Sequence, residues 1–176
     1  MDLKLIGAEA TEAEKAAIAS AVPEALTVEV PGRVVRIRRD LRHYLLPAID
    51  AVQSAVGWVS PGAVDEIARR LQVPPAEVYG VASFYALVST KPRPPTVAHV
   101  CNDIACGPDL AAALGERDDV VESPCLGQCD RRPAVFLQRA GTDDVVLTHA
   151  TPDTVLAALD GDVGDDTPGF VSPGPL

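Results

Sequence analysis

Residues 96–110 read TVAHVCNDIACGPDL, a stretch that joins an apolar run, a pair of cysteines and the start of a helix. The run TVAHVC (96–101) predicts a buried strand, and DLAAAL (109–114) predicts a short helix. Cys101 and Cys106 stand between them in a C-x4-C pattern. A strand that leads through such a loop into a helix is typical of an α/β domain, in which ligands bind beyond the carboxyl ends of strands.

The segments that follow extend this pattern to a small domain. DVVES (119–123) predicts a second strand, PAVFLQR and DVVLTHA predict a hairpin around Ala140-Gly141, and TPDTVLAAL predicts a closing helix capped by Thr151. The order β-α-β-β-β-α indicates an α/β sandwich of the thioredoxin kind. We expect this domain to span residues 96–160. A Gly/Pro-rich acidic tail at 161–176 has too few apolar residues for a core of its own.

The preceding part of the chain predicts a helical region over residues 1–90. Thr11 and Glu14 form a capping box, and three further amphipathic segments are predicted as helices, with Leu45, Leu46, Ile49, Val52 and Val56 forming the apolar stripe of one of them. Short connections favour a helical bundle, and a short hairpin is expected at 26–38. The proline-rich TKPRPP (90–95) cannot continue a helix and is interpreted as the domain boundary. The predicted class is therefore α+β.

Aromatic and apolar residues near this boundary allow two expectations. Trp58, Tyr79, Phe84 and Tyr85 occur at helical spacing, which is typical of core residues. The segment ASFYALV (82–88) runs to the boundary with little polar relief, and this predicts an apolar surface that contacts a partner.

Composition excludes several classes of protein. The chain is 47% hydrophobic and 23% charged, with a formal net charge of −10, which argues against nucleic acid as a ligand. No apolar run reaches the roughly 18 residues of a membrane span, so direct membrane insertion is not expected. The N-terminus lacks a basic segment leading into an apolar one, as a signal peptide requires. We therefore expect a cytoplasmic protein with reduced thiols.

All four cysteines belong to two motifs, CNDIAC with Cys101 and Cys106, and CLGQC with Cys125 and Cys129. Disulfides are disfavoured in a reducing compartment, and neither pair has the C-x-x-C spacing of redox-active dithiols. A structural zinc ion with four thiolate ligands fits the spacing, and so does a [2Fe–2S] cluster with one pair for each iron. Spacing alone leaves these two alternatives open.

Each cysteine pair follows the C-terminal end of a predicted strand, so the two loops are expected to converge. Gly107 and Gly127 are expected to permit close backbone approach there, and freed N–H groups could donate to sulfur. His99 precedes Cys101 by two residues and is interpreted as a core histidine with satisfied hydrogen bonds. No GxGxxG or P-loop motif is present, so no nucleotide site is expected on this chain.

The chain resembles a known family over most of its length, from about Leu41 to Leu159. The segment LLPAIDAVQSAVGWVSPGAVDEIARRLQVPPAEVYGVASFYALVSTKP, with CNDIAC and CLGQC after it, is similar to the small [2Fe–2S] subunits of bacterial NADH dehydrogenases. These include the E subunit of NADH-quinone oxidoreductase, the gamma subunits of NAD-dependent formate dehydrogenases and the equivalent subunit of NAD-reducing hydrogenases. Here the spacer 107–124 is shorter than that family leads us to expect, and the segment 26–38 resembles an insertion.

The resemblance implies an electron-transfer subunit that performs no hydride chemistry itself. It implies one [2Fe–2S] cluster held by Cys101, Cys106, Cys125 and Cys129. FMN and NAD are expected on a partner, an F-like flavoprotein within a larger oxidoreductase complex, in the cytoplasm or on the cytoplasmic side of a membrane. The alternative is a non-redox interaction module stapled by zinc.

Overall fold

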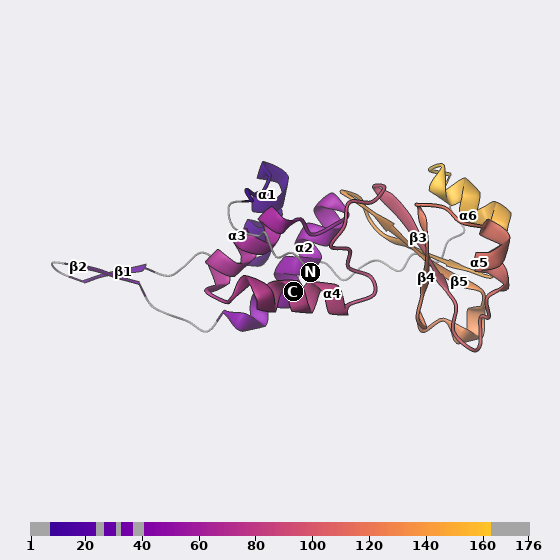
Figure 1. Cartoon of the computed structure of the whole chain (residues 1–176), viewed down its shortest axis with the longest axis horizontal. Coiled ribbons are helices and arrows are strands. Elements are labelled where there is room, and N and C mark those ends of the chain that lie inside the picture. The colour runs from indigo at the N-terminus through magenta and orange to yellow at the C-terminus, as the bar shows by residue number, and fades with distance from the viewer. Residues whose placement is uncertain (1–7, 24–26, 31–32, 37–40, 163–176) are drawn as a thin grey trace.

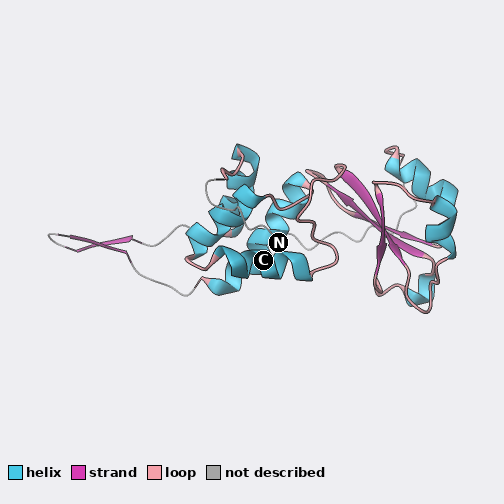
Figure 2. Cartoon of the chain, in the orientation of Figure 1, coloured by secondary structure: helices cyan, strands magenta, loops and turns pink. Residues whose placement is uncertain are grey.

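The computed structural model describes residues 8–23, 27–30, 33–36 and 41–162. Figure 1 and Figure 2 show a helical bundle beside an α/β domain, so the predicted α+β class is confirmed. In chain order the elements are α1 (Glu12–Ala21), β1 (Thr27–Val30), β2 (Arg33–Arg36), η1 (Arg42–Tyr44), α2 (Leu45–Val56), α3 (Pro61–Leu71), α4 (Pro75–Phe84), β3 (Thr96–Cys101), α5 (Asp109–Leu114), β4 (Val120–Ser123), η2 (Cys129–Arg131), β5 (Ala134–Arg139), β6 (Val145–Thr148) and α6 (Pro152–Leu159).

Capping residues mark the ends of several bundle helices. Thr11 and Glu14 form the capping box of α1, and the Ser60 hydroxyl accepts a hydrogen bond from Ala63 N at 3.0 Å at the start of α3. Gly57 ends α2 in the left-handed conformation, with φ of +89°. Within the described residues the four helices share one apolar core, whose largest fully buried side chains include Ile18, Ile49, Ile67, Val52 and Val64.

Two details of the predicted bundle are wrong. Periodicity predicts Leu46 on the apolar stripe of α2, but it is 41% exposed, because it lies outside the buried face formed by Leu45, Ile49 and Val52. The segment AEVYGVASFYALV (76–88) is predicted to be helical throughout, but α4 ends at Phe84, and a turn follows in which Val88 N donates to Tyr85 O.

In the expected hairpin segment β1 pairs with β2 in antiparallel register, with Val30 opposite Arg33. The rest of the expected 26–38 range lies outside the described residues, and so do residues 163–176 of the expected tail. None of the described helices has the length and apolar character needed to span a bilayer.

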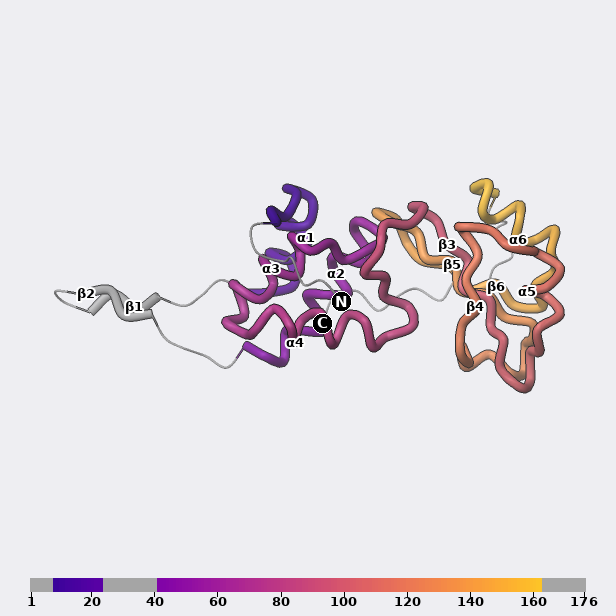
Figure 3. Tube along the Cα trace, viewed as in Figure 1, coloured from indigo at the N-terminus to yellow at the C-terminus, as the bar shows by residue number. Residues whose placement is uncertain are grey.

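The α/β domain contains a four-stranded sheet in the order β4-β3-β5-β6. β3 pairs in parallel with β4 and antiparallel with β5, while β5 and β6 form the predicted hairpin. α5 and α6 pack on one face, which Figure 1 shows as the face turned away from the bundle, and Figure 3 traces the same path. This domain has a separate core, formed by Ala98, Val100, Leu110, Ala111, Leu114, Val135, Ala150 and Val155.

Arg93 links the helical bundle to the α/β domain. Its Nε donates to the carbonyl oxygen of Gly57 at the end of α2 at 2.6 Å, and its Nη2 donates to Gln138 Oε1 on β5. Nearby, Gly141 N, in the turn between β5 and β6, donates to Ser54 O of α2 at 2.8 Å. Because side-chain and backbone bonds act together, the end of α2 and the sheet are held in a defined relative position.

Gly62 allows the start of α3 to approach the segment before α1. A Cβ added at Gly62 would lie 2.4 Å from Glu9 O and 2.7 Å from Ala10 N, both backbone atoms. Backbone cannot swing aside as a flexible side chain does, so this contact requires glycine. Gly80 in α4 has no atom within 4 Å of its added Cβ.

We predict that Gly62→Ala and Gly80→Ala have opposite effects on stability. The first variant should lower the free energy of unfolding by about 1–3 kcal/mol, because α3 must move away from residues 9 and 10. The second should raise it by about 0.5–1 kcal/mol, since alanine favours the helical conformation over glycine. Urea denaturation of both variants measures the difference, and equal stability of the two would contradict the close contact.

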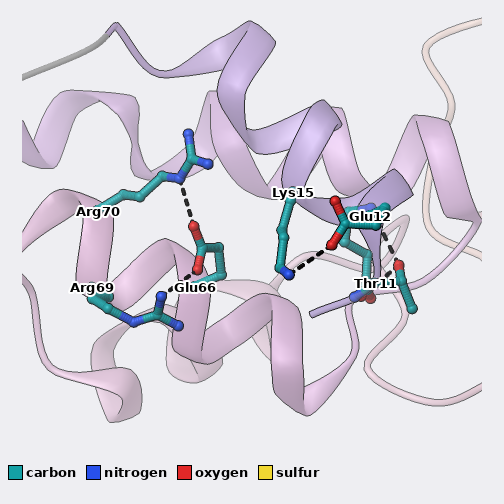
Figure 4. Close-up of polar contacts among 7 residues, drawn as sticks. Thr11, Glu12, Lys15, Glu66, Arg69 and Arg70 are labelled. Carbon is teal, nitrogen blue, oxygen red and sulfur yellow. Dashed lines mark hydrogen bonds and ion pairs between the residues drawn. The ribbon is translucent and has the colours of Figure 1, made fainter. Parts of the chain in front are cut away.

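Glu66 is a buried carboxylate with two cationic partners on its own helix. The residue is 6% exposed, and its oxygens contact Arg70 Nε at 2.7 Å and Arg69 Nη1 at 2.6 Å. Figure 4 shows this cluster near the exposed Lys15–Glu12 pair of α1. The hydrogen bond from Arg70 is the largest cause that lowers the pKa of Glu66, and the charge of Arg69 adds to it.

We predict that this carboxylate contributes to bundle stability above pH 4.5, its ordinary pKa, and less as the pH falls through the lower folded-state pKa. Glu66→Gln should lower the free energy of unfolding at pH 7 by about 1 kcal/mol. The difference in free energy of unfolding between this variant and the parent chain should shrink in acid, where Glu66 is protonated and therefore uncharged like glutamine. Glu12→Gln is the control, since the Glu12 side chain is 91% exposed. A pH-independent loss in Glu66→Gln would show that charge is not the cause.

Candidate metal centre

The four cysteines lie in two loops at the same edge of the sheet. Cys101 is the last residue of β3 and Cys106 lies in the turn after it, while Cys125 follows β4 and Cys129 begins η2. Because β3 and β4 are parallel neighbours, with Cys101 opposite Ser123, both strands end at this edge. The predicted convergence of the two loops is confirmed.

The sulfur atoms are grouped in the two pairs that the sequence suggests. All four thiols are free, and Cys125 Sγ lies 3.6 Å from Cys129 Sγ. The Cys101 and Cys106 thiols lie close enough for each to shift the pKa of the other. Cys101 is buried and Cys106 is half-buried, whereas Cys125 and Cys129 are exposed. The site therefore has an inner pair and an outer pair.

Backbone N–H groups point at the sulfur of Cys101. Burial raises the pKa of the Cys101 thiol, but N–H groups of Asp103 and Leu126 and the Cys106 thiol outweigh it, and the net pKa is lowered. Leu126 belongs to the second loop, between Cys125 and Cys129. A thiolate at Cys101 is thus stabilised by hydrogen bonds from both loops.

The thiols of Cys106 and Cys129 have raised pKa values. Burial is the largest cause that raises the pKa of Cys106, followed by the Cys101 thiol. The pKa of Cys129 is raised first by its hydrogen bond with Cys125 and then by the charge there. Each pair also acts electrostatically on the other. Such a group of thiols is suited to a bound cation, which compensates the charge of thiolates.

The first loop is a tight turn organised around Asp103. Its carbonyl accepts from Cys106 N at 2.9 Å and from Gly107 N at 2.8 Å, and its carboxylate accepts from Ile104 N at 2.7 Å. Gly107 and Gly127 have φ of +73° and +74°, with open space where a Cβ would lie. Both glycines thus have a left-handed backbone, which favours glycine, and the close approach to a cluster expected of them stays a prediction.

His99 is buried as expected, but its ring is only partly satisfied. Nε2 lies 3.0 Å from Gln138 Oε1 and 3.3 Å from Arg93 Nη1, while Nδ1 has no partner among the described residues. Burial, and then the charge of Arg93, lower the pKa of His99 to about 4. Its polar contacts are with the domain junction and not with the thiols.

The donor set has the chemistry that a [2Fe–2S] cluster requires. No three His, Cys, Asp or Glu side chains in the described ranges are arranged to hold one metal ion. Two thiol pairs with N–H groups directed at sulfur are the donors that a [2Fe–2S] cluster uses, one pair for each iron.

Two aromatic residues expected in the core lie on the surface instead. Phe84 is 80% exposed and Tyr85 is 42% exposed, and the two rings pack edge to face with centroids 5.3 Å apart. They follow the last buried turn of α4, where the helix ends earlier than predicted. Ile104, which sequence patterns do not single out, is fully exposed between Cys101 and Cys106. Its position between two candidate metal ligands is the sequence feature that could have predicted this exposure.

A family model and several related proteins both support the resemblance to [2Fe–2S] subunits. The family model of the thioredoxin-like [2Fe-2S] ferredoxins matches residues 33–117, a span that includes Cys101 and Cys106 and ends before Cys125. The chain is 29% identical to the NADH-quinone oxidoreductase E subunit of Pseudomonas aeruginosa, over 70% of this chain and 86% of that protein.

Two further relatives bear the same name. The NADH-quinone oxidoreductase E subunit of Escherichia coli (strain K12) is 27% identical, with the same coverage of 70% and 86%. That of Buchnera aphidicola subsp. Acyrthosiphon pisum is 28% identical over 69% of this chain and 82% of that protein. The resemblance stated from the sequence is therefore confirmed.

Proposed function

Because this chain is a relative of the E subunit of NADH-quinone oxidoreductase and has a thioredoxin-like [2Fe–2S] ferredoxin domain, we propose that it is an electron-transfer subunit. Cys101 and Cys106 would bind one iron of a [2Fe–2S] cluster, and Cys125 and Cys129 the other. The observation that carries this proposal is the convergence of two free thiol pairs at the shared edge of β3 and β4.

The zinc-stapled module is the competing proposal. One zinc ion requires four thiolates around a single point, a donor set that the same four cysteines could supply. The Cys125–Cys129 separation of 3.6 Å suits two ligands of one metal. We prefer the cluster because the family model that matches residues 33–117 is that of the thioredoxin-like [2Fe-2S] ferredoxins.

When bound, such a cluster accepts and releases one electron at a time. The chain's own groups set the conditions for this. Cys101 lies within the protein, where N–H groups of Asp103 and Leu126 donate to its sulfur. Ala134 N–H lies against the sulfur of Cys106 in the same way. Donors of this kind stabilise negative charge on sulfur, so they favour the reduced state.

The partner is proposed to be an F-like flavoprotein that carries FMN and binds NAD. NADH would give two electrons to the flavin as a hydride and leave as NAD+, and one of these electrons would pass to this chain. The second would leave the flavin for another acceptor of the larger complex. The present chain would thus be a non-catalytic subunit of an oxidoreductase, which we place in the cytoplasm.

Exposed apolar residues in the helical bundle and in the α/β domain support contacts of both with the partner. Ile104 extends from the first cysteine loop, and Phe84 extends from the end of α4. Apolar side chains exposed at such positions are typical of interfaces. Contact through Ile104 would bring the partner next to Cys101 and Cys106, which is where electron transfer requires it.

We predict that the purified chain contains two irons and two inorganic sulfides per molecule, since four thiolates in two pairs suit this cluster. Iron and acid-labile sulfide analysis with a visible absorption spectrum tests this. Stoichiometric zinc without sulfide would establish the alternative. Cys129→Ala should lose most of the iron while circular dichroism shows an unchanged helical content. Asp130→Asn is the neighbouring control and should keep its iron.

We predict that NADH reduces the chain only in the presence of the flavoprotein. Alone, it should accept one electron from dithionite, give an electron paramagnetic resonance signal and fail to oxidise NADH, because it has no nucleotide motif. In the co-expressed complex with the flavoprotein, NADH should reduce the cluster as dithionite does in the isolated chain. NADH oxidation by the flavin-free chain would contradict the assignment.

Ile104→Asp should weaken co-purification with the flavoprotein by about 10-fold or more, since it places a charge in an apolar contact. Val121→Asp is the matched control, because Val121 is a 39% exposed residue of β4 outside both cysteine loops. Equal weakening by the two variants would place the contact elsewhere on the domain.

A further inference from the structure

The segment just after the Cys125–Cys129 loop contacts the first cysteine loop through a side chain that the proposed ligands do not include. Arg132 Nη1 donates to the carbonyl oxygen of Ala105 at 3.2 Å. Ala105 directly precedes Cys106, and Arg132 follows Cys129 by three residues. Among the described side chains between β4 and β5, Arg132 is the one that hydrogen-bonds to the first cysteine loop.

The backbone on both sides of Arg132 is anchored. Arg131 O accepts from His149 N at 2.9 Å, and Pro133 O accepts from Ala150 N at 3.0 Å. These two bonds tie the segment to the chain that leads into α6. The Arg132 side chain therefore extends from a fixed point, and its bond to Ala105 limits how far the first loop can move from the second.

The charge of Arg132 has a second consequence at this position. A guanidinium keeps its charge at every relevant pH, and this one contacts the residue adjacent to Cys106. Four thiolates around a cluster carry net negative charge, which increases when an electron is added. A fixed positive charge beside them favours the reduced state by Coulomb attraction.

We propose that Arg132 is a positioning residue of the cysteine site, which holds the Cys106 loop against the Cys125–Cys129 loop and raises the reduction potential of the bound cluster. This inference rests on the proposed function. An exposed hydrogen bond contributes little to the stability of the whole fold. Its effect is instead local, because it acts between the two halves of one site.

Arg131 provides a matched control in the adjacent position. It is also an exposed arginine, but its Nε lies 3.6 Å from Asp130 Oδ2, so its charge is paired within the second loop. Only its backbone carbonyl takes part in the anchoring described above, and a side-chain substitution leaves that carbonyl in place.

The test compares Arg132→Gln, Arg132→Lys and Arg131→Gln in the full-length chain loaded with its cluster. Two quantities are measured: the reduction potential in a mediated dithionite titration, and the rate at which the oxidised chain loses iron to a chelator. Arg132→Gln should have a more negative potential and lose iron about 10-fold faster, a usual effect of removing a group that supports metal ligands. Arg132→Lys should restore the potential but not the full retention of iron, and Arg131→Gln should match the parent.

Thermal unfolding of the three variants without the cluster should coincide with that of the parent, which separates a local effect from misfolding. Parental potential and iron retention in Arg132→Gln would overturn the inference, and so would an equal change in Arg131→Gln. If the parent chain itself binds no iron and sulfide, the proposed function fails. If the parent is loaded and only the variants are indistinguishable, the role of Arg132 alone fails.

Discussion

The parallel pairing of β3 with β4 is the constraint on which the cysteine site depends. Parallel strands end at the same edge of a sheet, so the chain must cross back through α5 before the second cysteine loop can begin. Register matters as much as direction. Cys101 lies opposite Ser123, and a slip of one residue would turn Cys101 toward the opposite face of the sheet. The hydrogen bond from Asn102 N to Ser123 O extends this register into the first loop.

A second constraint acts behind the site, on the face of the sheet that carries His99. Arg93 connects the end of α2 with His99 and Gln138, so the bundle and the strand that ends in Cys101 share one polar cluster. His99 is neutral at pH 7 because burial and Arg93 keep its pKa low. A charged imidazole would repel the guanidinium here. The neutral ring allows Arg93 to remain at the junction.

Local patterns account for most of the fold. The capping box of α1 predicts the start of that helix correctly, and the Ser60 cap and Gly57 are local signals of the same kind, because each involves residues close together in the chain. The alternation and length of the apolar runs likewise predict the order of the strands in the chain. Helical periodicity identifies Phe84 and Leu46 as apolar positions but does not show which face is covered, and both are exposed. Whether such a residue is buried depends on where the helix ends and on which elements pack against it. Both are determined by the tertiary structure.

The candidate site is predictable to the level of its four cysteines and the convergence of their loops. Its supporting bonds are not, since they join residues far apart in sequence. The contact between Arg132 and Ala105 and the N–H of Leu126 at Cys101 exist only once the sheet register is set. Gly107 and Gly127 stand out in the sequence, but their left-handed backbone is known only from the structure.

The difference in exposure between the inner and outer cysteine pairs bears on how the protein matures. Cys125 and Cys129 are open to solvent, whereas Cys101 is covered. A donor that delivers iron and sulfide can therefore reach the outer pair after the sheet has formed, with no need to unfold the domain. The same opening gives oxidants and chelators a route inward while the chain is free. If Cys125 and Cys129 become buried when the chain joins a larger complex, that route closes. The cluster would then have to be inserted before the chain joins the complex.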